Sequence, residues 1–365
     1  MSFDVTVYGT PDNRHSPYLY CGLSLLKEEG FIHTLIVKSE KYYRNDRVVL
    51  NDVNWERSHR PYPYAIKTKI LNRKTGSLKR IGFDLQDWDH FLSLHCLEEC
   101  DIIYKRAYLP HGFDNISEQF NTLIRPFGFT YPVDFQDDSF SKIQKWTKYR
   151  NRLFYALQYP DELFKKIIQS LSKPVTIQNT KLSCEAEIEL PPEYIFFQVQ
   201  CYDSSWPEAD ALNLYRAGLI RKLKDEFKDQ FLGGMFFETD IPDSYHDCVT
   251  NVPTERNAYL HYAKNADIVI STNGFGGSLP WKLAEYFQLG KCVVSENLAH
   301  TALKPIIPDV HLKVFHDYDN CIAIIKELLN QKNKINEIGR NGKKYFKEFI
   351  FPGAALKSLI KDAFS

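Results

Sequence analysis

The sequence predicts an α/β protein made of two doubly wound, Rossmann-like domains that face each other across a cleft. Two observations carry this prediction: strand-like and helix-like segments alternate along the chain, and the alternation starts afresh after Pro192. Such alternation is typical of parallel sheets with helices on their faces. The length of 365 residues is enough for two domains, each with its own core. Because ligands of these folds bind at the carboxyl ends of the strands, we expect the site in the cleft.

The first half begins with a strand over 3–9 and a helix in which Ser16 is the expected cap and Pro17 lies in the first turn. Each later strand pattern is again followed by a helical one, which is β-α-β order. The further predicted elements are the strand HTLIVKS, a basic, tyrosine-rich stretch at 41–80, a helix around 88–99, the strand DIIYKRA and a helical region over 141–171.

The second half repeats the alternation after a linker that ends at Pro191-Pro192. Its predicted strands are YIFFQVQ, FLGGMFF, DIVIST, KCVVSE and HLKVF, with helices between them. We therefore expect an N-terminal domain over 1–175, a C-terminal domain over 176–345, and a helical tail over 346–365 that can cross back to the first domain.

Composition excludes several classes of function. Lysine plus arginine equals aspartate plus glutamate at 46 each, so no net positive field recruits nucleic acid. The eight cysteines are scattered without a C-x-x-C pair, which favours reduced thiols and a cytoplasmic location. No apolar run approaches the ~20 residues that span a bilayer, and the N-terminus is not a signal peptide. Peripheral membrane contact stays open.

The stretch STNGFGGSLPWKLAEY carries the strongest functional signal. Gly276 and Gly277 allow a ligand to approach the backbone, and with Ser278 they open a predicted helix whose free amides attract anions such as a diphosphate. Lys282 can add a point charge to the phosphates, and Glu285 shares its helical face and suits a ribose diol. The alternative is an ordinary capped helix with a solvated lysine–glutamate pair.

Further donor-site candidates lie in the same half. Arg216 and Arg221, on the helix after the first strand of the second domain, can neutralise a leaving phosphate or face water. Asn273, just before the glycines, can reach a donor sugar or cap the turn.

In the first half, Lys105 and Arg106 end a strand, where they can steady a phosphate or an anionic acceptor.

The run NADIVIST-NG-GGS-PWKLAEYFQLGKCVVSE resembles the donor-binding segment of GT-B glycosyltransferases, in the branch that carries K-L-x-E-Y-x-x-x-G-K. RAGLIRKLKDEFKDQFLGG and INEIGRNGKKYFKEFIFPGAAL resemble the same family in matching order, so the likeness covers residues 193–355. It implies that the C-terminal domain binds a nucleotide sugar, with Glu285 on the ribose and Gly276, Gly277 and Ser278 on the diphosphate. Many retaining members carry a second glutamate where this chain has Gly277, which leaves the donor sugar and the stereochemical outcome open.

An inverting transferase needs one carboxylate or histidine to take a proton from the acceptor hydroxyl. Asp12 and His15 lie in the loop after the first strand, and Asp134 lies in YPVDFQDD. These three residues are the candidates for the base. The alternative for the first loop is a turn held by Asp12 and Asn13 side chains.

Two D-x-D triplets, at 87–89 and 317–319, precede helical patterns, and we interpret both as helix N-caps. The histidines show no ligand spacing, so we expect no metal and no cofactor other than the nucleotide-sugar donor. The predicted function is transfer of a sugar from that donor to a hydroxyl of a glycan, glycolipid or glycoprotein. The alternatives are a nucleotide-sugar epimerase on the same fold and a non-catalytic sugar-binding subunit.

Overall fold

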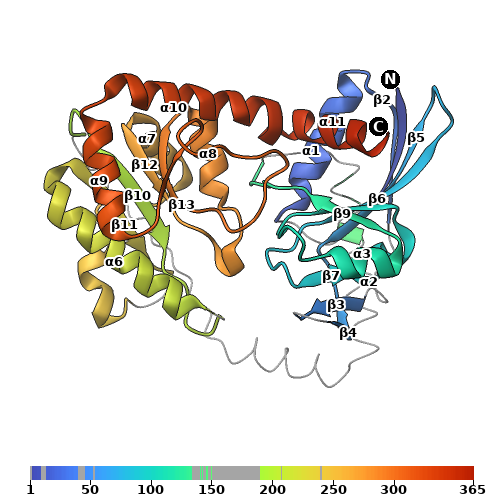
Figure 1. Ribbon diagram of the computed structural model, residues 1–365, viewed down its shortest axis with the longest axis horizontal. Coiled ribbons are helices and arrows are strands. Elements are labelled where there is room, and N and C mark those ends of the chain that lie inside the picture. Colours follow the sequence, from blue (N-terminus) through green and yellow to red (C-terminus); the bar gives the residue numbers. More distant parts are fainter. Residues whose placement is uncertain are drawn as a thin grey trace.

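The computed structural model describes two α/β units, each built around its own main sheet (Figure 1). The predicted fold class is confirmed. The units are joined along one edge by the last helices of the chain (Figure 1). The described residues are 2–9, 14–39, 46–51, 54–133, 190–206, 208–238 and 241–365, with single positions between 140 and 149.

The main sheet of the first unit has six strands in the order β2-β1-β5-β6-β8-β9. All neighbouring strands are parallel except that β5 runs antiparallel to both β1 and β6. No strands were predicted within 41–80, so this β5–β6 hairpin is a difference from the prediction. The strands are β1 (Phe3–Gly9), β2 (Ile32–Ser39), β5 (Ala65–Asn72), β6 (Leu78–Asp84), β8 (Ile102–Lys105) and β9 (Leu123–Pro126).

The loop between β6 and β8 differs from the predicted helix around 88–99. Its central part is a strand, β7 (Phe91–Ser93), which pairs with β3 in a small second sheet of order β4-β3-β7. The helix α2 (Leu94–Glu99) starts only after Ser93, whose Oγ accepts from the amide of Cys96 at 3.2 Å. The 87–89 triplet is therefore not an N-cap. The other elements here are β3 (Asp46–Leu50), β4 (Trp55–Pro61) and α3 (Asp114–Phe120).

The second unit has five parallel strands in the order β11-β10-β12-β13-β14. Counted within the unit this is 2-1-3-4-5, so the topological switch point, where ligands of such sheets bind, lies between β10 and β12. Asp317 caps α9, as predicted, by accepting from the Asn320 amide at 2.8 Å. The strands are β10 (Ile195–Gln200), β11 (Phe231–Phe236), β12 (Ile268–Ser271), β13 (Cys292–Glu296) and β14 (Lys313–Phe315).

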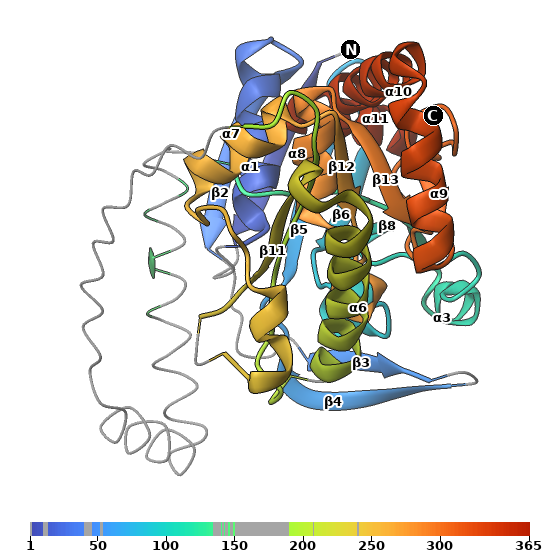
Figure 2. The same cartoon turned by 90° about the vertical axis from the view of Figure 1, so that its left-hand side faces the viewer.

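Helices cover both faces of this sheet. Figure 2 shows α6 and α9 on one side and α7 and α8 on the other, and separate apolar clusters fill the two layers. The cluster under α7 and α8 continues into the first unit, so one core spans both. The helices are α6 (Ala209–Phe227), α7 (Arg256–Asn265), α8 (Trp281–Leu289), α9 (Tyr318–Leu329) and α10 (Lys332–Tyr345).

The chain ends on the first unit. α11 (Pro352–Ala363) packs against α1 (Ser16–Glu28) so closely that a Cβ at Gly22 would lie 2.6 Å from a Leu356 methyl. The N-cap position of α1 is His15, one residue earlier than expected, and its side chain makes no cap hydrogen bond. The side chain of His15 is instead in contact with Trp281 of the second unit. The predicted domain boundary at 175/176 lies outside the described residues.

Candidate functional site

The glycine turn after β12 lies at the switch point and faces the first unit. Gly276 and Gly277 have φ values of 57° and 73°, a left-handed conformation that favours glycine. Two backbone amides that were expected to bind an anion make hydrogen bonds within the turn. The N–H of Gly277 donates to Gly274 O at 3.2 Å, and the N–H of Ser278 donates to Phe275 O at 3.0 Å. The helix α8 starts only at Trp281. Side chains, rather than those two amides, must therefore supply the positive charge.

Neighbouring side chains leave no room for larger residues in this turn. A Cβ at Gly276 would lie 2.7 Å from Cε3 of Trp88 in the first unit, and one at Gly277 would lie 2.8 Å from Cβ of Ala299. A glutamate at position 277 would therefore meet both this contact and a left-handed backbone.

Two cations, one buried and one half-buried, flank the switch point. Arg216 is 4% exposed and donates to Thr272 Oγ1, Gln200 O and Asn273 O at 3.3, 3.2 and 3.1 Å. Lys282 is half-buried and donates from Nζ to Gln198 O, with the Tyr259 ring 4.6 Å from its ammonium group. Within the described part of the chain, neither cation has a carboxylate at ion-pair distance.

Burial and the neighbouring charge change the acidity of both cations. The pKa of Lys282 falls to about 7, chiefly because of burial and also because of the nearby charge of Arg216, while Glu285 opposes the shift. The pKa of Arg216 is also lowered, chiefly by burial. The site therefore holds positive charge that the protein itself leaves unpaired, which is what an anion-binding site requires.

Glu285 is 5% exposed, and its Oε1 lies 2.7 Å from Nη1 of Arg256. Arg256 opens α7, in the loop NVPTERNAYLHY. The carboxylate that the resemblance assigns to a ribose is thus already paired with a cation that is half exposed. Arg256 was not singled out in the sequence, where only the position of this loop before a helix marked it.

The two arginines of α6 have different surroundings. Arg221 lies on the surface and makes a two-bond contact with Asp247, at 2.6 and 2.8 Å, away from the switch point. Five residues in a helix turn the side chain by roughly 140°, so Arg216 and Arg221 cannot share one face. The prediction of Arg221 as a donor-site residue is therefore corrected, and only Arg216 lies with Asn273.

Asn273 fixes the start of the glycine turn. Its backbone N–H donates to Glu296 Oε2 at 2.7 Å, and its side-chain Nδ2 donates to Asn297 O at 2.9 Å. Its Oδ1 is buried and has no hydrogen-bond partner among the residues that the structure describes. An unsatisfied buried acceptor is costly, so a ligand hydroxyl here would complete the side chain.

The loop 87–90 of the first unit brings a histidine–aspartate pair to this turn. His300 is 3% exposed, its Nε2 lies 3.8 Å from Asp89 Oδ2, and its Nδ1 is buried without a partner. The nearby imidazole of His300 lowers the pKa of Asp89 to about 2, against the effect of burial. The Cε1 of His300 lies 3.9 Å from the Cβ position of Gly277. Sequence reasoning missed this pair because its members are far apart in the chain.

His15 is the one predicted base that the described residues include, since Asp12 and Asp134 lie outside them. It is 2% exposed, with Nδ1 2.8 Å from Thr130 Oγ1 and Nε2 3.7 Å from Asp87 Oδ1. Its ring meets the edge of Trp281 at a centroid distance of 5.3 Å. Both ring nitrogens have partners, whereas a general base needs an open lone pair. This geometry gives His15 a positioning role at the junction.

Lys105 and Arg106 make contacts within the protein instead of facing a ligand. Lys105 is fully buried and lies 3.0 Å from Asp84, which is also fully buried. Arg106 pairs with Asp87 and donates from Nη2 across the junction to Leu279 O at 3.0 Å. Their predicted contact with a phosphate is replaced by contacts within the protein.

The described ranges contain no group of three or more histidine, cysteine, aspartate or glutamate residues placed to hold a metal ion. They also contain no helix with the length and apolar character that crossing a bilayer requires.

A scan of protein-family models and a search of curated protein sequences return no match. Among solved structures, the chain is similar to the sucrose-phosphate synthase from Thermosynechococcus elongatus, with a TM-score of 0.37 and 13% identity over 74% of this chain and 60% of that one. It is similar to TarM, with a TM-score of 0.34 and 14% identity over 88% and 66%. It is also similar to a UDP-N-acetylglucosamine 2-epimerase, with a TM-score of 0.28 and 11% identity over 68% and 86%. Likenesses of this size decide neither activity nor substrate.

Proposed function

We propose that the chain is a GT-B glycosyltransferase that moves a sugar from a nucleotide-diphosphate donor to a hydroxyl of a glycan, glycolipid or glycoprotein. One observation carries the proposal: at the switch point of the second sheet, Arg216 and Lys282 are cations without a carboxylate partner among the described residues. A bound diphosphate supplies the missing negative charge. The resemblance of 193–355 to the donor-binding segment of this family supports the same ligand. The free cysteines of the described residues suit a cytoplasmic enzyme.

Charge on the leaving diphosphate grows as the bond to the sugar breaks. Arg216 and Lys282 are held in place by backbone carbonyls, so they stabilise that charge without reorganising. Two fixed cations can fill the role that a divalent metal has in other transferases. The proposed step therefore needs no metal ion.

His300 is the proposed contact to the donor sugar. With Asp89 facing Nε2 at 3.8 Å, the proposed tautomer carries its proton on Nε2, and Nδ1 is the acceptor beside Gly277. A sugar hydroxyl can donate to it. His300 would then take the role of the glutamate that many retaining members of the resembled family carry at the position of Gly277. Arg256 and Glu285 together would meet the ribose, with the arginine turning aside when its carboxylate partner accepts the diol.

The experiment that tests the proposal compares two arginines of one helix. We expect uridine, guanosine or adenosine diphosphate to raise the melting temperature of the protein by mass action. Arg216→Met should weaken the nucleotide that binds by about tenfold or more, since a charge-assisted hydrogen bond is lost. Arg221→Met is the matched control and should leave the affinity unchanged. Equal loss in both variants, or no response to any nucleotide, would contradict the proposed site.

Turnover separates the remaining activities. A transferase releases nucleoside diphosphate from a nucleotide sugar only when an acceptor is added. A nucleotide-sugar epimerase would convert the donor without an acceptor, and a binding subunit would bind nucleotide sugar without converting it. Donor and acceptor panels analysed by mass spectrometry distinguish the three outcomes.

A further inference from the structure

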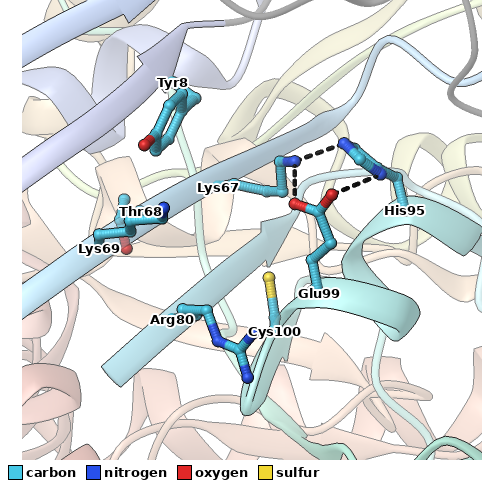
Figure 3. Close-up of a pocket in the computed structure, with 8 residues that line it drawn as sticks. All are labelled: Tyr8, Lys67, Thr68, Lys69, Arg80, His95, Glu99 and Cys100. Atoms are coloured by element: carbon cyan, nitrogen blue, oxygen red, sulfur yellow. Dashed lines mark hydrogen bonds and ion pairs between the residues drawn. The ribbon is translucent and has the colours of Figure 1, made fainter. Parts of the chain in front are cut away.

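A pocket on the first unit shares no residue with the cluster at the glycine turn. It opens between the main sheet and α2 (Figure 3), and its volume is ≈ 200 Å³. Pockets that bury a drug-sized ligand have about 300–1,000 Å³, so this one suits a single group at the end of a larger molecule. The residues that line it are Tyr8 on β1, Lys67, Thr68 and Lys69 on β5, Arg80 on β6, and His95, Glu99 and Cys100 around α2.

A like-charged pair lies in the wall of this pocket. Lys69 and Arg80 are directly opposite each other in the antiparallel register of β5 and β6. Like charges in that relation destabilise a sheet, so packing alone does not explain the pair. Asp101 neutralises Arg80, with Oδ1 2.8 Å from Nη2. Lys69 is exposed and has no carboxylate at ion-pair distance in the part of the chain that the structure describes, so only solvent compensates its charge.

The neighbouring cation is fixed in position. Figure 3 shows Lys67, His95 and Glu99 directed toward one another, with the Lys67 ammonium 2.6 Å from Glu99 Oε2. Tyr8 faces Lys67 across the β1–β5 register. The ammonium groups of Lys67 and Lys69 lie 6.0 and 5.8 Å from the centre of the Tyr8 ring, at the outer limit of a cation–π contact. The pocket thus combines an aromatic ring, a fixed cation and a cation without a counter-charge.

We propose that this pocket binds an oxyanion, a phosphate or sulfate ester carried on a sugar. Lys69 and Arg80 would hold the oxygens by charge-assisted hydrogen bonds, and the ester would supply the negative charge that the cross-strand pair lacks. The half-buried ring of Tyr8 offers an apolar surface to the sugar that carries the ester. The size of the pocket limits the ligand to one such group. This binding site does not depend on the transferase activity.

Isothermal titration of glucose 6-phosphate, with glucose and inorganic phosphate for comparison, tests the proposal. The titrations use the Lys282→Met chain, so that anion binding at the switch point is reduced. We expect glucose 6-phosphate to bind more tightly than phosphate, and glucose not to bind. Lys69→Glu should weaken glucose 6-phosphate by about tenfold or more. Lys79→Glu is the matched control: Lys79 is opposite the buried Ile70, so its side chain leaves the other face of the sheet. It should change the affinity little.

Three results would overturn the proposal. They are equal loss in the Lys69→Glu and Lys79→Glu variants, equal binding of glucose and its phosphate, and no binding of either anion. Phosphatidylcholine vesicles with and without phosphatidylglycerol test the other source of an oxyanion. If only anionic vesicles bind in a Lys69-dependent way, the sugar as carrier is refuted. Lys69→Gln, which removes the charge without reversing it, should give a smaller loss and controls for misfolding of the glutamate variant.

Discussion

Lys282 links the stability of the protein to its proposed ligand. Its pKa falls from 10.5 in a free side chain to about 7 in the folded protein, because burial penalises the charged form. Between these values the unfolded chain holds a proton that the folded chain lacks. Stability therefore rises with pH across this window, and the full penalty is present below pH 7. Lys282→Met removes the penalty.

We expect Lys282→Met to raise the free energy of unfolding by about 1–4 kcal/mol at pH 6, with a smaller gain near pH 10. Urea denaturation of both proteins at the two pH values measures the change. The same variant should lose most of the affinity for nucleoside diphosphate. A variant that is less stable at both pH values would show that Lys282 supports the fold instead.

The same pKa predicts proton uptake on binding. A diphosphate beside Lys282 favours the charged ammonium and raises its pKa, so at pH 8 binding should take up to about one proton from the buffer. Calorimetry in HEPES and in Tris buffer, which differ in ionisation enthalpy, should give different apparent binding enthalpies. Affinity should also fall as the pH rises above 7. In the Lys282→Met variant, the enthalpy should not depend on the buffer.

At the scale of the element, the glycine turn combines two constraints that can be separated. Ala at position 277 must adopt a left-handed backbone, and its Cβ would also meet that of Ala299 at 2.8 Å. We expect Gly277→Ala to lower the free energy of unfolding by about 1–3 kcal/mol. Adding Ala299→Gly removes the contact but not the backbone strain, so it should restore part of the loss. Thermal denaturation of the single and double variants checks this, and purely additive effects would contradict the close contact.

Individual elements also show which features of the fold and the site could be predicted from the sequence. The Asp317 cap of α9, the strands of the second sheet and the two-unit α/β architecture follow from local patterns that the sequence displays. The 87–89 triplet looked like another cap, yet its aspartates face Arg106 and His300, and only the fold brings those partners near. The loss of the Gly277 and Ser278 amides to the turn is likewise a matter of backbone geometry. Residue types indicated the right region, and geometry decided their roles.

At the scale of the whole molecule, the two units meet through polar contacts around loop 87–90. The amide of Thr301 donates to Tyr108 O at 2.9 Å, near the pair of His300 with Asp89. Asp89→Asn keeps the shape but weakens the hold on the imidazole. We expect this variant to bind nucleoside diphosphate normally and to lose about tenfold or more in kcat with its sugar donor. A change in nucleotide affinity of the same size would mean that the loop serves the phosphates rather than the sugar.

The return of α11 to the first unit makes the fold of one unit depend on the other end of the chain. Leu356, Leu359 and Ile360 are buried there, and burial of each such side chain contributes about 1.5–3 kcal/mol. Deleting residues 352–365 should therefore remove hydrogen-exchange protection from α1 and β1, while β10, β12 and β13 stay protected. Lys357→Ala, which breaks the exposed 2.9 Å contact with Glu29 and a cation–π contact with Phe31 but leaves the apolar side chains of α11 in place, is the control and should change protection little, because exposed ion pairs and exposed cation–π contacts each contribute at most about 1 kcal/mol. If α1 keeps its protection in the shortened chain, the first unit is stable without the tail, and the tail then serves to hold the two units together.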